Sequence, residues 1–235
     1  MGCEAETIGP FTAFTNTVVP VPWYNFAMVL PGADGAPDAE AIARLTEYYR
    51  ARGFPPRVNF VEALAPAELG PALAAAGYDR VEREHVMFQG EPVEPAVPPE
   101  LTLGEAREEN MADFARILQV SFGMPEGPEP EWRPRQVERM RAAGVHHLAA
   151  WLDGRLAGVT NLHARFGVAH ITAVATDPDH RRRGVAAALT AYAVRVGRSE
   201  GAQFAALEVA TPEAERVYAR LGFLRVAERV EYWIE

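Results

Sequence analysis

Residues 168–235 alternate between strand-like and helix-like patterns, and this alternation is the feature that most limits the possible fold. In chain order the patterns are a strand in "VAHITAVAT", a helix from about Gly184 to Ser199, a strand in "AQFAALEVA", a helix in "PEAERVYARLG" and a strand in "LRVAERVEYWIE". Strands that alternate with helices of this length favour a sheet with parallel neighbours and helices packed on it. We therefore expect a mixed α/β (α+β) fold, with a central mixed sheet flanked by helices.

The preceding residues extend this domain back to residue 101. Helical patterns occur in "MADFARILQVSF" and "PEWRPRQVERMRAAG", and two strand-like runs follow, "VHHLAAWLDG" and "RLAGVTNLHARFG". The two runs meet at Asp153-Gly154, a dipeptide that favours a two-residue hairpin turn. The segment "GEPVEPAVPPE" at 90–100 contains four prolines and three glutamates and few residues that could pack. The sequence therefore predicts an N-terminal half at 1–92, a linker at 93–100 and a domain at 101–235.

The N-terminal half repeats the strand–helix–strand–helix–strand order of residues 168–235. Its segments are "WYNFAMVL", "DAEAIARLTEYYRARG", "PRVNFVEA", "PAELGPALAAAG" and "YDRVEREHVMF". The endings run in register, since Gly77-Tyr78 matches Gly222-Phe223 and Leu73 falls where Tyr218 would be. This agreement predicts an internal repeat, and an unrelated small α/β cap is the alternative.

Composition excludes several classes of function. All 23 basic residues are arginine, which removes lysine Schiff-base chemistry and the lysine-dependent P-loop. A formal net charge of -9 argues against nonspecific nucleic-acid binding. The single cysteine, Cys3, excludes an intramolecular disulfide, and no apolar run is long enough for a membrane span. We expect a cytoplasmic protein with no metal, nucleic-acid or membrane partner, and the sequence leaves open whether it forms a homodimer.

The densest positive charge lies in "VATDPDHRRRGVAAAL", where a strand ending at Thr176 turns into a helix that opens near Gly184. The first amides of a helix have no partner within the helix, and together with the helix dipole they form a site for phosphate. Gly184 lets the backbone approach an anion closely, and Ala186 keeps the next turn free of bulk. The turn is therefore a candidate anion-binding site.

This stretch resembles the acetyl-CoA loop of the GNAT superfamily, the Gcn5-related N-acetyltransferases, through its Arg-x-x-Gly-x-Ala motif. A second block, "LEVATPEAERVYARLGF", resembles the family's Ala-x-x-x-Tyr-x-x-x-Gly-Phe run. The resemblance implies a GNAT fold and acetyl-CoA as co-substrate. It also implies cofactor contacts along the strand end and turn, at Val174, Ala175, Thr176, Arg181, Arg182, Arg183, Gly184, Val185 and Ala186. Thr211 is a further expected cofactor contact; it replaces the Asn that opens the next helix in the family, and it can still cap that helix.

The resemblance further implies catalytic residues. Tyr218 corresponds to the tyrosine that protonates the departing CoA thiolate, and an aromatic packing role is its alternative. Glu208 occupies a position that carries a catalytic glutamate in some relatives, with His163 and His170 on neighbouring strands as further candidates. The acceptor is expected near residues 121–136, where Phe122 and Trp132 could form an apolar wall and Glu126, Glu129 and Glu131 could attract a cationic amine.

These assignments predict an N-acetyltransferase in which a primary amine of a small molecule or peptide attacks the thioester directly in a ternary complex. A non-catalytic acyl-CoA-binding sensor is the alternative from another class, and a nucleotide-phosphate binder is a weaker one. In the N-terminal half, Asp34 and Asp38 stand where the arginine turn should be. Like charges would repel a pyrophosphate, so this half is interpreted as a degenerate GNAT-like half that does not bind acetyl-CoA in the same way.

Overall fold

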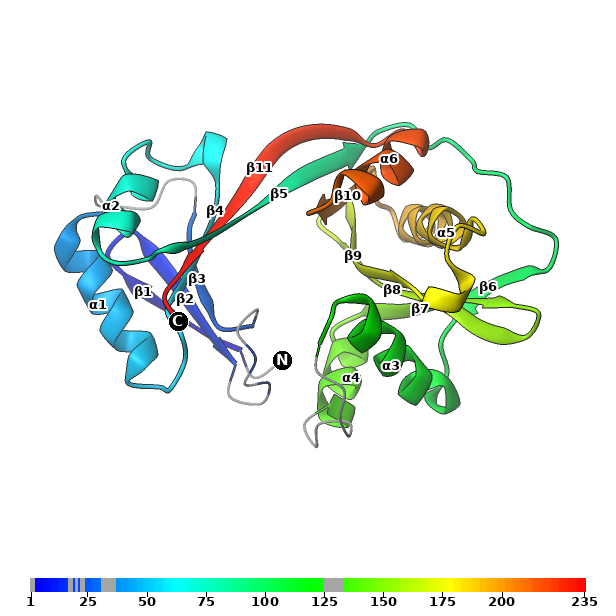
Figure 1. Cartoon of the computed structure of the whole chain (residues 1–235), viewed down its shortest axis with the longest axis horizontal. Helices are drawn as coiled ribbons and strands as arrows, with labels where there is room; N and C mark the ends of the chain where they lie inside the picture. Colours follow the sequence, from blue (N-terminus) through cyan, green and yellow to red (C-terminus); the bar gives the residue numbers. More distant parts are fainter. Residues whose placement is uncertain (1–2, 17–18, 20, 22–23, 31–36, 125–132) are drawn as a thin grey trace. The chain divides into compact units, whose positions relative to one another are not determined.

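A computed structural model describes the chain in two compact units, the first comprising Met1–His85 with Ala227–Glu235 and the second Val86–Val226. Figure 1 shows the elements of both. The described residues are 3–16, 19, 21, 24–30, 37–124 and 133–235. The division differs from the predicted 1–92 and 101–235 because two long strands, β5 (Arg80–Gln89) and β11 (Leu224–Trp233), each begin in one unit and end in the other.

The first unit is built on the strand order β1-β2-β3-β4-β11-β5. Its own strands are β1 (Cys3–Ile8), β2 (Phe11–Asn16), β3 (Phe26–Val29) and β4 (Arg57–Val61), with helices α1 (Ala39–Arg50) and α2 (Leu69–Ala75). Both helices bury apolar side chains against the sheet, and these include Ile42, Leu45, Leu69 and Leu73. The β1–β2 hairpin was not predicted, because residues 3–8 are mostly exposed and carry little apolar periodicity.

The second unit is built on the order β5-β10-β9-β8-β7-β6. Its strands are β6 (Leu101–Glu105), β7 (Val145–Leu152), β8 (Arg155–Arg165), β9 (Val168–Thr176) and β10 (Phe204–Val209), and its helices are α3 (Met111–Ser121), α4 (Arg133–Ala142), α5 (Val185–Ser199) and α6 (Pro212–Arg220). One core lies under α5 and α6, and a separate core lies under α3. The predicted mixed α/β fold with helix-flanked sheet is confirmed, although β6 was missed.

The predicted internal repeat has matching local geometry in the two units. Strands β3 and β4 are parallel neighbours, as are β9 and β10. Gly77 and Gly222 have φ of 90° and 89°, in the left-handed region that favours glycine. The amide of Tyr78 donates to the carbonyl of Leu73 at 3.0 Å, and that of Phe223 donates to Tyr218 at 3.1 Å. The register proposed from sequence therefore describes equivalent helix ends.

Two glycines let α5 lie unusually close to the sheet. A Cβ on Gly197 would lie 2.4 Å from the Cβ of Ala169 on β9, and one on Gly158 would lie 2.6 Å from Cγ1 of Val185. Neither distance is compatible with a side chain at these positions. The close contact sets the position of α5 on β8 and β9, and thus the place where the arginine-rich turn must enter the helix.

The proline-rich linker is attached to the second unit along its length. The amide of Val93 donates to the carbonyl of Leu221 at 3.1 Å, and Glu94 pairs with Arg195 at 2.8 Å. Pro98 lies close enough to Gly184 to be 3.7 Å from a Cβ built there. Most linker residues are exposed, as expected from the few side chains that could pack, and backbone and charged groups supply these contacts. Within the described part of the chain, no helix is long and apolar enough to cross a bilayer.

Met87 tests whether the second unit depends on strand β5. It lies in the β5 segment of that unit and is 1% exposed within the core under α5. We expect Met87→Ala to lower the free energy of unfolding by about 2–5 kcal/mol, because the substitution loses buried methylenes and leaves a cavity. Val81→Ala is the control on the same strand, since Val81 is 46% exposed. Urea unfolding measures both, and equal small losses would contradict a structural role for β5.

Candidate active site

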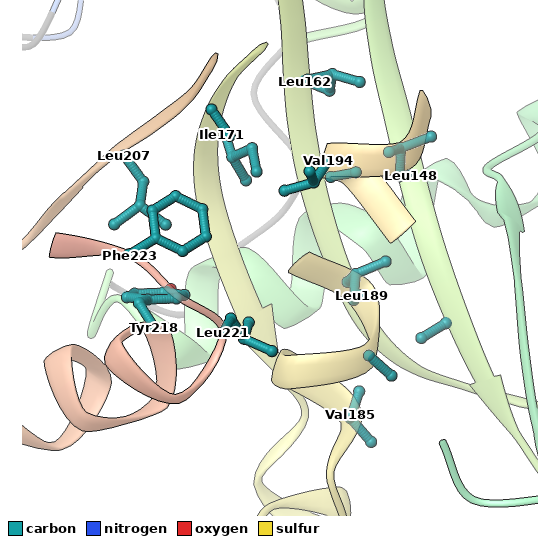
Figure 2. Close-up of a cluster of buried hydrophobic side chains, with 14 of the residues drawn as sticks. Leu148, Leu162, Ile171, Val185, Leu189, Val194, Leu207, Tyr218, Leu221 and Phe223 are labelled. Carbon is teal, nitrogen blue, oxygen red and sulfur yellow. The ribbon is translucent and has the colours of Figure 1, made fainter. Parts of the chain in front are cut away.

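The parallel strands β9 and β10 are paired over a short distance only. Their pairs are Phe204 with Val168, Ala205 with Ala169 and Ala206 with His170. Beyond these pairs the strands diverge, as Figure 2 shows for the strands that carry Ile171 and Leu207. The part of β9 after His170 is paired with β8 alone among the described strands. Its β10 side is thus an edge along which an extended ligand can bind.

Strand β9 also contains a bulge just before the predicted cofactor contacts. Ala173 has φ of 56°, and the register with β8 shifts between Val159 and Asn161. A non-glycine residue in this region is uncommon, and a bulge re-aims the groups that follow it. The predicted contacts Val174, Ala175 and Thr176 come directly after the bulge, on the diverging half of the strand.

The turn after β9 is held at its start by Asp177, which is 6% exposed. Its Oδ1 accepts from the amide of Asp179 at 3.1 Å, and its Oδ2 accepts from Nη2 of Arg116 on α3 at 2.7 Å. Burial alone would raise the pKa of Asp177, but the hydrogen bonds from Arg116 and the Asp179 amide outweigh it and lower the pKa. Asp177 thus remains an anion that fixes the base of the turn.

The first amides of α5 have no partner within the helix. Gly184 is the N-cap residue with φ of 79°, and no side chain caps the helix. The first hydrogen bond of the helix runs from the amide of Ala188 to the carbonyl of Gly184 at 3.0 Å. The preceding amides, of Val185, Ala186 and Ala187, therefore have no acceptor within the helix and can donate to an anion.

The three arginines of the turn have different surroundings. Arg183 lies 3.6 Å from Asp153 and 3.9 Å from Glu100, and Nε of Arg181 donates weakly to the carbonyl of Thr176 at 3.5 Å. Arg182 has no partner among the described residues and has φ of 58°. Its guanidinium is free to bind a diphosphate, whereas Arg183 already has two exposed carboxylate neighbours, which bind it weakly.

Tyr218 lies on α6 within the core of the second unit. Thr211 caps this helix by accepting from the amide of Ala214 at 3.3 Å, as predicted. Tyr218 is 7% exposed, and its ring lies edge-on to Phe223 at 6.0 Å (Figure 2). Its hydroxyl has no hydrogen-bond partner among the described residues. Burial raises the pKa of Tyr218 to about 12, so the phenol keeps its proton at neutral pH.

Glu208 is paired with a histidine that the sequence had left as a further candidate. Its Oε2 lies 2.9 Å from Nε2 of His170 on the neighbouring strand. The ring of His163, directly across from His170 on β8, lies 6.1 Å from the His170 ring. The sequence placed His163 and His170 on neighbouring strands, but the strand order was needed to bring Glu208 beside His170.

The predicted acceptor side is described in part. Phe122 follows the last residue of α3 and is 57% exposed, so it is available to a ligand. Trp132, Glu126, Glu129 and Glu131 lie outside the described residues. The described residues also enclose a hollow of about 370 Å³ beside α4, lined in part by Glu108, Val137 and Arg141. None of the motif residues lines it.

The equivalent helix start in the first unit is occupied by an acidic side chain. Asp38 caps α1, and its Oδ1 accepts from the amide of Ala41 at 2.8 Å. A carboxylate at this point uses one of the amides that a phosphate would need and adds like charge. This supports the interpretation that the first unit does not bind acetyl-CoA as the second would. Asp34 lies outside the described residues.

The second unit thus combines an α/β fold, a diverging parallel strand pair and a helix start whose first amides have no partner within the helix. Residues 111–223 match the acetyltransferase (GNAT) family, and the chain thus carries a GNAT acetyltransferase domain. No curated protein sequence matches the chain.

Solved structures of GNAT proteins have the same fold over nearly the whole chain. A GCN5-related N-acetyltransferase from Kribbella flavida is 23% identical with a TM-score of 0.78, covering 99% of this chain and 89% of that one. One from Sphaerobacter thermophilus is 16% identical with a TM-score of 0.70, covering 97% and 81%. A tandem GNAT protein from the clavulanic acid biosynthesis pathway is 18% identical with a TM-score of 0.68, covering 96% and 78%.

Proposed function

We propose that this protein is an acetyl-CoA-dependent N-acetyltransferase that transfers the acetyl group to a primary amine of a small molecule or peptide. The observation that carries the proposal is the anion-binding turn from Arg181 to Ala186, which opens α5 beside the diverging half of β9. Membership of the acetyltransferase family supports it.

The residues present fit the co-substrate. The amides of Val185, Ala186 and Ala187 and the guanidinium of Arg182 would hold the diphosphate, and the backbone from Val174 to Thr176 would hold the pantetheine arm. Gly184 has no side chain to obstruct the diphosphate, and its φ of 79° is one that glycine adopts without strain. Acetyl-CoA supplies an activated acyl group as a thioester.

The transfer requires proton movements at two groups of the site. The acceptor ammonium first loses a proton to the Glu208–His170 pair, whose side chains are partly exposed and can pass it to solvent. The neutral amine attacks the acetyl carbon, so that a C–N bond forms and the C–S bond then breaks. The departing thiolate takes a proton from the Tyr218 hydroxyl, which burial keeps protonated, and the second proton that the nitrogen loses restores that hydroxyl. No covalent acyl-enzyme is needed, and Cys3 lies on β1 in the other unit.

Ligand-dependent stability gives the first test. We expect acetyl-CoA to raise the melting temperature, because a ligand at roughly 100-fold excess over its dissociation constant stabilises the native state by about 2.7 kcal/mol. ATP and NAD, with a phosphate chain but no pantetheine arm, are the controls and should give no comparable shift. Differential scanning fluorimetry makes the measurement. An equal shift with ATP would point to a general phosphate site instead.

Turnover tests the reaction itself. CoA release should be followed with acetyl-CoA and a panel of polyamines, amino acids, aminoglycosides and lysine-containing peptides. Release that depends on one amine class supports the proposal and identifies the acceptor. Tight acetyl-CoA binding with no release for any amine would favour the sensor alternative.

A further inference from the structure

We propose that Nδ1 of His170 is the group that takes the proton from the acceptor amine, and that Glu208 is the residue that positions it. This inference rests on the proposed acetyltransfer. It changes the roles of the two residues, because the sequence had pointed to Glu208 as the proton acceptor.

The pair lies where the site opens. His170 belongs to the last pair that joins β9 to β10, and the strands diverge directly after it. The bulge at Ala173 follows three residues later on the same strand. Both side chains are reachable from solvent, with exposed fractions of 40% for His170 and 30% for Glu208. A group at this point lies beside the half of β9 that would hold the thioester.

The hydrogen bond determines which nitrogen can accept a proton. The contact of 2.9 Å joins Nε2 of His170 to Oε2 of Glu208. A carboxylate can only accept, so Nε2 carries the hydrogen, and in the neutral imidazole Nδ1 keeps its lone pair. When Nδ1 takes the amine's proton, the imidazolium that forms lies next to an anion that stabilises it. A carboxylate that orients an imidazole in this way acts through the imidazole.

The other neighbour of His170 does not oppose a positive charge there. The ionisable side chains that contact His170 within the described chain are Glu208 from β10 and His163 from β8. Burial is the main cause that lowers the pKa of His163 to about 4. His163 is therefore neutral at physiological pH and adds no positive charge beside His170.

The first unit lacks this pair at the equivalent positions. Strands β3 and β4 align Ala27 with Val58 and Met28 with Asn59, as β9 and β10 align Ala169 with Ala205 and His170 with Ala206. In this alignment Met28 takes the place of His170. Val61, two residues after Asn59, takes the place of Glu208. Neither can take up a proton, which agrees with proton transfer being confined to the second unit.

The test compares two carboxylate-paired histidines of the second unit. In His170→Gln, the side-chain amide can still donate to Glu208, so the carboxylate keeps a partner while the titratable nitrogen is lost. His146→Gln is the matched control, because His146 on β7 has its Nε2 2.7 Å from Glu200 and lies away from β9 and β10 in the strand order. CoA release is measured with the amine that gives turnover in the unaltered protein, and acetyl-CoA affinity by titration calorimetry.

We expect His170→Gln to lower the turnover rate by about 10²–10⁴-fold with acetyl-CoA affinity within about threefold, and His146→Gln to stay within about twofold. The deficit of His170→Gln should shrink at high pH, where the amine loses its proton unaided. If His170→Gln keeps turnover within about tenfold while Glu208→Gln loses more, Glu208 is itself the acceptor and the proposal is wrong.

A second measurement does not depend on knowing the amine. Long-range ¹H–¹⁵N spectra of the full chain, assigned with His170→Gln, should show Nε2 protonated and Nδ1 unprotonated. The opposite tautomer would overturn the proposal. If the unaltered protein releases no CoA with any amine, the proposed function itself fails, and this result is distinct from either failure above.

Discussion

Acetyl-CoA binding is expected to be lost in Gly184→Glu, while the protein stays folded. The new carboxylate would lie at the start of α5, where the amides of Val185 and Ala186 are proposed to hold the diphosphate. Two like unit charges about 4 Å apart repel by roughly 4 kcal/mol in a partly solvated site. A 100-fold loss of affinity needs only about 2.7 kcal/mol. We therefore expect affinity to fall by at least about 100-fold in titration calorimetry.

The control for this variant is Gly201→Glu, beyond the opposite end of the same helix. Gly201 also has a positive φ, of 92°, and a Cβ there would meet nothing within 4 Å. Both substitutions carry the backbone strain of a side chain in the left-handed region, about 1–2 kcal/mol, and both add one negative charge. Gly201→Glu should bind acetyl-CoA as the unaltered protein does. Equal affinity in the two variants would remove the turn from the cofactor site.

Turnover is expected to fall by about 10²–10⁴-fold in Tyr218→Phe, the usual effect of removing a positioned proton donor. The hydroxyl has no hydrogen-bond partner among the described residues, so its removal breaks no contact in the core and should change stability little. The ring and its edge-on contact with Phe223 are kept. Burial raises the pKa of Tyr218 to about 12, above the ordinary value for tyrosine. Deprotonation of Tyr218 should therefore lower the turnover rate of the unaltered enzyme only as the pH approaches that value.

Tyr192→Phe is the matched control for Tyr218→Phe. Tyr192 lies on α5 and packs against the same core, with Arg195 over its ring at 5.7 Å. It should leave both turnover and acetyl-CoA affinity nearly unchanged. A fall of only about threefold in Tyr218→Phe would mean that water supplies the proton instead. Unchanged turnover would leave Tyr218 with its aromatic packing role alone.

Local sequence patterns were sufficient for the elements of the second unit and for the cofactor turn. The strand end at Thr176, the N-cap at Gly184 and the cap at Thr211 depend on neighbours within a few residues, so spacing and residue type predict them. The same holds for Asp153-Gly154, whose φ values of 52° and 75° suit the predicted hairpin turn. The equivalent helix ends at Gly77 and Gly222 could be predicted from the sequence for the same reason.

Contacts between residues far apart in the chain determined the unit boundaries, the linker contacts and the partners of the site residues. Strands β5 and β11 each contribute residues to both units, and the linker contacts α5 and the end of α6. Strand pairs and ion pairs depend on which segments the fold brings together, so local sequence patterns do not predict them. Arg183 looks like a phosphate ligand in the sequence, yet Asp153 and Glu100 lie beside it. His170 and Glu208 are 38 residues apart. They became a pair because β9 and β10 are parallel neighbours, and local periodicity contains no information about which strands are neighbours.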